Sequence, residues 1–148
     1  MRKILFFDDD SFITQWLIKN LKVNYGWDKN HSTEITQIAD LGKLLTEITD
    51  SDKQYDLFVL DIMSPEPSDD LKKSFTDEEL LRMNGGMSTG IVMKDKIRQQ
   101  ERYKNVPILY LSARLVPAQY LDNITIHIRK PESAEVISQT MSELLKTN

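Results

Sequence analysis

Acidic residues directly follow two short apolar runs of this chain, where a metal ion or a phosphoryl group could bind. One run leads into Asp8, Asp9 and Asp10, and another leads into Asp61. Carboxylate oxygens are the ligands that Mg²⁺ prefers, and a carboxylate can attack phosphorus to form an acyl phosphate. Considered alone, three consecutive acids are typical of a solvated helix start. Considered alone, an Asp at the end of a strand, such as Asp61, is typical of a turn. Together they favour a magnesium site with Asp61 as the candidate nucleophile.

Two further apolar runs end on residues that could contact a phosphoryl group. The run 106–111 leads into Ser112, and the run 124–129 leads into Lys130. A serine hydroxyl can donate to a phosphoryl oxygen, and a lysine binds phosphate as a mobile point charge. In isolation, a helix cap and a solvent-facing lysine are the commoner roles. The bond between Lys130 and Pro131 is a candidate for the cis isomer, which is found almost only before proline.

The hydrophobic pattern predicts the elements that would position these residues. Buried strands are expected at 3–7, 31–38, 57–60, 106–111 and 124–128. Helices are expected after each strand, at about 11–26, 41–48, 89–103, 113–122 and from Pro131 onward. Five strand–helix repeats predict an α/β fold with a doubly wound parallel sheet and helices on both faces. Open parallel sheets bind ligands at the carboxyl edge, so all four strand ends should meet in one cleft.

Local signals refine the helix predictions. Asp10 or Ser11 and Asp40 are expected caps, and the first helix carries an apolar repeat at Phe12, Ile13, Trp16, Leu17 and Leu21. The last helix should place Val136, Ile137, Met141, Leu144 and Leu145 on one face. Within 113–122, Pro117 makes the helix weak. Thr76 and Glu79 match a capping box for a short helix that stops at residues 84–86.

Composition limits the classes of function. The chain has 148 residues, which fits one domain, and its contents of 40% hydrophobic and 28% charged residues are those of an ordinary globular protein. It has no cysteine and two histidines, which excludes disulfides and makes a zinc site improbable. The net charge of −4 with scattered basic residues offers no footprint for nucleic acid. Without a signal peptide or a membrane-spanning run, we expect a cytoplasmic protein with no membrane partner.

With these segments in view, the sequence resembles a response-regulator receiver domain of two-component phosphorelays. The resemblance rests on residues 4–10, 60–65, 111–113 and 130–131 and covers nearly the whole chain. It implies a flavodoxin-like strand order of 2-1-3-4-5 and a signalling phosphoacceptor rather than an enzyme. Asp61 would accept a phosphoryl group from a histidine kinase or a histidine phosphotransfer protein. Mg²⁺ would be held by Asp9, Asp61 and the backbone carbonyl of Met63, and by Asp8 through water.

The resemblance also implies roles around the phosphoryl group. Ser112 and Lys130 would contact its oxygens, and His127 stands where receivers usually carry an aromatic switch residue. Met63 and Arg114 resemble positions that tune the lifetime of the acyl phosphate. The chain would be a stand-alone receiver over residues 1–148 that relays phosphate or binds a downstream protein target. A homodimer that forms on phosphorylation is left open.

One departure from the family pattern is an extra stretch at about residues 66–88, between the third strand and the third helix of the receiver pattern. Such long connections are often functional, and a lid or docking surface beside Asp61 is one hypothesis. Because longer loops cost little, a tolerated and partly disordered insertion is the other.

Two other classes of function compete. A hydrolase of the haloacid-dehalogenase type would use Asp8 as nucleophile in the pattern Asp8-x-Asp10, but it needs a later acidic motif, and no Asp follows Lys130. A receiver-like interaction module that works without phosphorylation is the second. The intact set of Asp9, Asp61, Ser112 and Lys130 argues against it.

Overall fold

The computed structural model describes residues 1–146, whose strands form a five-stranded sheet. The strands are β1 (Arg2–Phe7), β2 (Thr33–Ile38), β3 (Leu57–Leu60), β4 (Ile108–Ser112) and β5 (Thr125–Arg129). They are all parallel and pair in the order β2-β1-β3-β4-β5, which confirms the predicted doubly wound sheet. The order reverses between β1 and β3, and in such sheets ligands bind beyond the carboxyl ends of the strands at the reversal.

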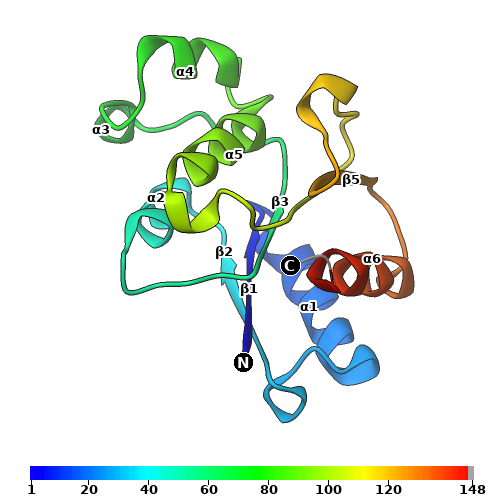
Figure 1. The fold of residues 1–148 in the computed structure, drawn as a ribbon. Helices are drawn as coiled ribbons and strands as arrows, with labels where there is room; N and C mark the ends of the chain where they lie inside the picture. The colour runs from blue at the N-terminus through cyan, green and yellow to red at the C-terminus, as the bar shows by residue number, and fades with distance from the viewer. Residues whose placement is uncertain (147–148) are drawn as a thin grey trace.

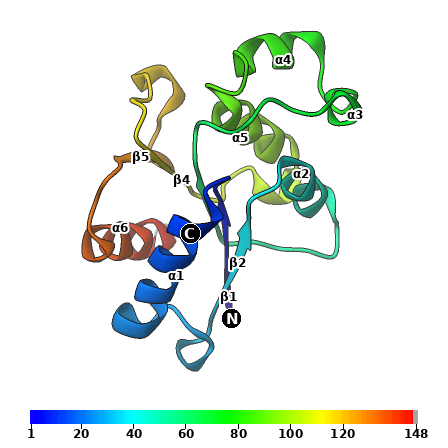
Figure 2. The same cartoon turned by 180° about the vertical axis from the view of Figure 1, so that it is seen from behind.

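Helices cover both faces of the sheet (Figures 1 and 2). On one face, α1 (Ser11–Tyr25) and α6 (Ala134–Lys146) pack on a core that includes Ile4 and Phe6. On the other, α2 (Leu41–Thr49) and α5 (Thr89–Gln99) pack on a core that includes Leu5 and Phe7. Successive side chains of a strand point to opposite faces. Because both faces are covered, β3 and β4 are buried along their whole length, which explains their continuous apolar sequences.

Several predicted caps are present. The Asp10 carboxylate accepts a hydrogen bond from the Ile13 N–H at 3.2 Å and starts α1. Asp40 does the same for α2 through the Lys43 N–H at 2.9 Å. Thr76 opens α4 (Asp77–Met83) with the predicted capping box, and Asn84 ends it in the left-handed conformation. The cap at Asp10 fixes the turn between β1 and α1, which carries Asp8 and Asp9.

Two sequence predictions about helices were wrong. Residues 113–122 form no α-helix; the only helical turn there is the 3₁₀ turn η3 (Ala118–Tyr120). Pro117 lacks an N–H and disfavours helical geometry in the residue before it, which explains the failure. The helix expected near 89–103 also ends at Gln99, and residues 101–103 form a separate 3₁₀ turn, η2 (Glu101–Tyr103).

The apolar repeat of α1 is only partly buried: Leu21 lies in the core and Leu17 packs against it, but the first three members of the repeat do not. The residues that face the core are Thr14, Ile18 and Leu21. Phe12, Ile13 and Trp16 are instead 69%, 59% and 61% exposed. The cap at Asp10 sets where the helix begins, and the position of α1 on the sheet then decides which stripe is covered. An apolar stripe is thereby left on the surface.

The 66–88 segment is folded and packs beside α5 (Figure 1). It contains the short helix α3 (Asp69–Lys72), which the sequence did not predict, and then α4. Phe75 and Met83 are buried in the same core as α5. Two ion pairs add to this contact, between Glu79 and Lys96 at 3.0 Å and between Arg82 and Asp95 at 2.5 Å.

Among residues 1–146, no helix combines the length and the apolar character that crossing a bilayer requires.

Candidate functional site: an acidic cluster in a cleft at the carboxyl edge of the sheet

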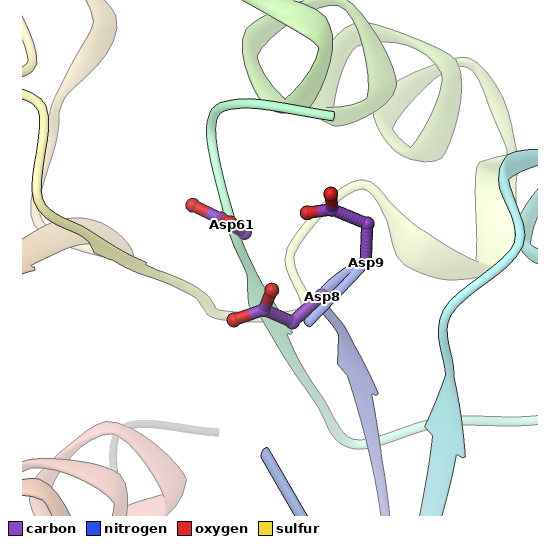
Figure 3. Close-up of side chains that lie close together, drawn as sticks. All are labelled: Asp8, Asp9 and Asp61. Atoms are coloured by element: carbon purple, nitrogen blue, oxygen red, sulfur yellow. The ribbon is translucent and has the colours of Figure 1, made fainter. Parts of the chain in front are cut away.

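Three carboxylates meet at the carboxyl ends of β1 and β3 (Figure 3). Asp8 and Asp9 directly follow β1, and Asp61 directly follows β3. One oxygen of each lies within 4.8 Å of one oxygen of the others. The pairing of Phe7 with Leu60 brings the strand ends level, so the sheet itself creates the cluster. The sequence prediction that Asp8, Asp9 and Asp61 converge is confirmed.

Lys130 supplies the positive charge of the cluster. It follows β5, and its Nζ lies 2.5 Å from Oδ2 of Asp8 and 3.9 Å from Oδ2 of Asp61. Its backbone N–H also donates to the carbonyl oxygen of Ser112 at 3.0 Å. The bond to Pro131 is cis, as the sequence suggested. One ammonium thus faces three acids, which leaves the cluster short of positive charge.

The environment opposes ionisation of two of the acids. Burial and the neighbouring charge of Asp8 raise the pKa of Asp61 to about 6, against the lowering effect of Lys130. Burial and Asp8 also raise the pKa of Asp9. A bound cation would remove this repulsion. Hard carboxylate oxygens suit Mg²⁺, so the donor set fits the ion that the sequence predicted.

An open cleft of about 440 Å³ adjoins the cluster. Asp9 and Asp61 line it, whereas Asp8 does not and is buried. The Asp61 side chain keeps one oxygen bonded to the Ile62 N–H at 2.8 Å, which fixes its orientation. Met63 lies on the lip of the cleft and is 40% exposed. Asp61 is therefore the carboxylate that is both held in place and open to a ligand.

Ser112, Arg114 and His127 lie on the other side of the cleft. Ser112 ends β4, is buried and lines the cleft. Its Oγ accepts a hydrogen bond from the Arg114 N–H at 3.2 Å. Nε2 of His127 lies 3.2 Å from the Ser112 carbonyl oxygen. The structure thus groups His127 and Arg114 around Ser112, beside the cleft.

Sequence reasoning missed residues that build the remaining wall. Gly86 and Met87, at the end of the 66–88 segment, line the cleft. Gly86 has a φ of +97°, and a Cβ built on it would lie 2.0 Å from the Ser64 carbonyl oxygen. Gly90 is equally constrained, because its Cβ would lie 2.2 Å from the Asp61 carbonyl oxygen. In the sequence, Gly85 and Gly86 were visible as a helix stop. Their sequence pattern did not show that Gly86 packs against the backbone of Ser64.

Comparisons with known proteins point to one fold. Neither a family model nor a curated protein sequence matches the chain. Among solved structures, the chemotaxis protein CheY4 of Vibrio cholerae is similar with a TM-score of 0.66 and 21% identity, over 97% of this chain and 98% of that one. A CheY-like receiver domain protein of Methanospirillum hungatei is similar with a TM-score of 0.68 and 16% identity, over 99% and 95%.

The response regulator TrrA of Thermotoga maritima, solved in complex with Mg²⁺ and BeF, is similar with a TM-score of 0.63 and 20% identity, over 97% of this chain and 99% of that one. Because all three identities are below one quarter, these similarities concern the fold. The chain has the fold of response-regulator receiver domains over nearly its whole length.

Proposed function

We propose that this chain is a phosphorelay response regulator that accepts a phosphoryl group on Asp61 with the help of Mg²⁺. The observation that carries the proposal is the position of Asp61, which is held by the Ile62 N–H, lines the open cleft and lies within 4 Å of Lys130. A receiver fold supplies the context. A fold does not by itself assign a function, whereas the chemistry of a site does.

In the proposed reaction, the attacking atom is Oδ2 of Asp61, the oxygen that does not bond the Ile62 N–H, and it attacks the phosphorus of a phosphohistidine. The O–P bond forms as the P–N bond breaks, and the imidazole leaves with the electron pair. Lys130 stands 3.9 Å from that oxygen and would shift from Asp8 toward the added negative charge. Such a transfer depends on positioning and charge neutralisation. Asp61 supplies the positioned oxygen, and Lys130 neutralises negative charge.

Asp8, Asp9 and Asp61 would hold Mg²⁺, with Asp8 acting through water and the Met63 carbonyl as a further ligand. When bound, the ion would neutralise charge on the acids and on the phosphoryl oxygens. Asp8 also accepts the Asp10 N–H at 2.9 Å and pairs with Lys130. Its two oxygens are therefore occupied by the protein, which suits an indirect role.

The readout would begin at Ser112. Its hydroxyl would turn to the phosphoryl group, and His127, which contacts the Ser112 carbonyl, would repack. The protein would act as a signalling phosphoacceptor that assists its own phosphorylation and dephosphorylation, not as an enzyme with an external product. Its partners would be a histidine kinase or a phosphotransfer protein and a downstream protein.

Incubation with Mg²⁺ and a small acyl-phosphate donor, followed by intact mass, tests the proposal. The wild type should gain the mass of one phosphoryl group, and Asp61→Asn should not. A hydrolase of the haloacid-dehalogenase type would instead depend on Asp8, so Asp8→Asn should then abolish the adduct and Asp61→Asn should not. A chain that gains no mass with any donor would fit the phosphorylation-independent interaction module.

A further inference from the structure

Arg114 joins the two sides of the acceptor cleft. Its guanidinium Nη1 donates to the Met87 carbonyl oxygen and, at 2.9 Å, to Oγ of Ser88. Its own N–H donates to Oγ of Ser112 at 3.2 Å. A single residue therefore contacts both the serine that would sense the phosphoryl group and the end of the 66–88 segment.

The end of that segment is a rigid wall of the cleft. The carbonyl of Gly86 accepts the Ser64 N–H at 3.0 Å, and the Met87 and Ser88 N–H groups bond to Asn84 and Met83 at 3.2 and 2.9 Å. Gly86 leaves no space for a side chain against Ser64. A shift at Met87 would therefore move the whole turn together with α4, since their hydrogen bonds are shared.

We infer that Arg114 is a clamp that couples phosphorylation of Asp61 to the position of the 66–88 segment. The inference rests on the proposed function. When the Ser112 hydroxyl turns toward a phosphoryl group on Asp61, it leaves the Arg114 N–H. The backbone at Arg114 is then free to shift, and its guanidinium loses the alignment with Met87 and Ser88. The signal would leave the molecule through the surface of α4.

The irregular structure of residues 113–122 allows the backbone at Arg114 to shift. They form no α-helix, and η3 is the only helical turn in them. Leu115 is 65% exposed, whereas Val116, Tyr120 and Leu121 pack on the core, so the backbone is least held at residues 113–115. Arg114 is the residue of this stretch that hydrogen-bonds to the end of the 66–88 segment. Coupling is reciprocal, so releasing the clamp must also change the stability of the acyl phosphate.

A matched pair of arginines makes the test sharp. Arg82 also holds the segment, through Asp95 at 2.5 Å, but it does not contact Ser112. The chain has no cysteine, so Met87→Cys provides a single labelling site for a fluorine NMR probe at a position 41% exposed. Val23→Cys, 71% exposed on α1 and outside the 66–88 segment, provides the reference probe for local environment.

Phosphorylation with Mg²⁺ and a small donor should shift the Met87→Cys signal much more than the Val23→Cys signal. Arg114→Ala should show the shifted signal before phosphorylation and little further change. Arg82→Ala should keep the wild-type response.

The intact mass of the same samples distinguishes a failure of the proposed function from a failure of the proposed coupling. A chain without a phosphoryl adduct overturns the proposed function and with it the coupling. An adduct on Asp61 without a change at Met87→Cys, or identical behaviour of Arg114→Ala and Arg82→Ala, overturns the clamp and leaves the phosphoacceptor role intact.

Discussion

Lys130 lies closer to Asp8 than to Asp61, at 2.5 Å and 3.9 Å between Nζ and the carboxylate oxygens. The resting ammonium is thus held by the carboxylate that the cleft does not expose. It remains within one short side-chain movement of the oxygen that would receive the phosphoryl group. Asp8 acts in this arrangement as a holding partner for the lysine.

Lys130→Ala should slow phosphorylation of Asp61 by a small donor roughly 100-fold, because one preorganised charge near the transferred group is lost. The measurement is the rate of adduct formation by mass at saturating Mg²⁺. Lys53→Ala is the control, because it removes an exposed lysine that precedes the amino end of β3, whereas Asp61 follows its carboxyl end. If the rate for Lys130→Ala stays within twofold of the wild-type rate, Lys130 has no role in the transfer. A twofold change in rate corresponds to about 0.4 kcal/mol of activation free energy.

The raised pKa of Asp61 predicts how stability depends on pH without metal. Folding raises this pKa from 3.8 to about 6, so between these values the folded state binds more protons than the unfolded state. The free energy of unfolding should therefore fall as pH rises from 4 to 6. Asp61→Asn should be more stable than wild type above pH 6, by at most about 3 kcal/mol.

Denaturant unfolding of both proteins in a chelating buffer at pH 4 and pH 7 checks this. Adding Mg²⁺ at pH 7 should stabilise wild type, by about 2.7 kcal/mol at a hundredfold excess over Kd, and should stabilise Asp61→Asn less. A parallel pH profile for the two proteins would contradict the raised pKa.

The exposed apolar stripe of α1 predicts where a phosphodonor protein docks. Ile13 borders a small pocket shared with Asp61 and Lys130, so the stripe is continuous with the acceptor site. Phe12 and Trp16 stack edge to face at 6.4 Å on the same surface. We expect a donor protein whose histidine reaches Asp61 to place an apolar helix over this stripe and bury it.

Trp16→Ala should slow phosphotransfer from a phosphorylated histidine phosphotransfer protein about tenfold or more, as expected for an aromatic interface residue. It should leave phosphorylation by a small acyl phosphate unchanged. Leu81→Ala is the matched control for the protein donor, because Leu81 is an apolar residue on α4 that is 80% exposed, against 61% for Trp16. Equal slowing with both kinds of donor would indicate a folding defect instead of docking.

We expect substitution by Ala to lower the free energy of unfolding by different amounts at the adjacent glycines Gly85 and Gly86. Gly85 has a φ of +64° with no atom near its missing Cβ, whereas Gly86 has a φ of +97° and faces the Ser64 carbonyl at 2.0 Å. Gly85→Ala should cost only the left-handed backbone penalty, about 1–2 kcal/mol. Gly86→Ala should cost at least about 2 kcal/mol more and shift the cleft wall. Urea unfolding of the two variants measures the difference, and equal costs would contradict the close approach.

The sequence pattern alone determined the strands, their parallel arrangement and the acids at their ends, and the order of the strands came from the resemblance to receiver domains. Periodicity reports which segments are buried on both faces, and a parallel sheet places all carboxyl ends on one edge. That is why Asp8, Asp9, Asp61, Ser112 and Lys130 could be grouped before any coordinates. The sequence also predicted the capping residues Asp10, Asp40 and Thr76. A capping side chain bonds to a backbone N–H only three residues further along the chain, so a local pattern is enough to predict it.

Only the tertiary structure decided which stripe of α1 is exposed and that Arg114 reaches the 66–88 segment. These features depend on contacts between parts of the chain that are distant in sequence. Arg114 and Met87 are 27 positions apart. No local pattern encodes such a contact, because the side chain meets its partner only after the sheet has brought β4 beside β3.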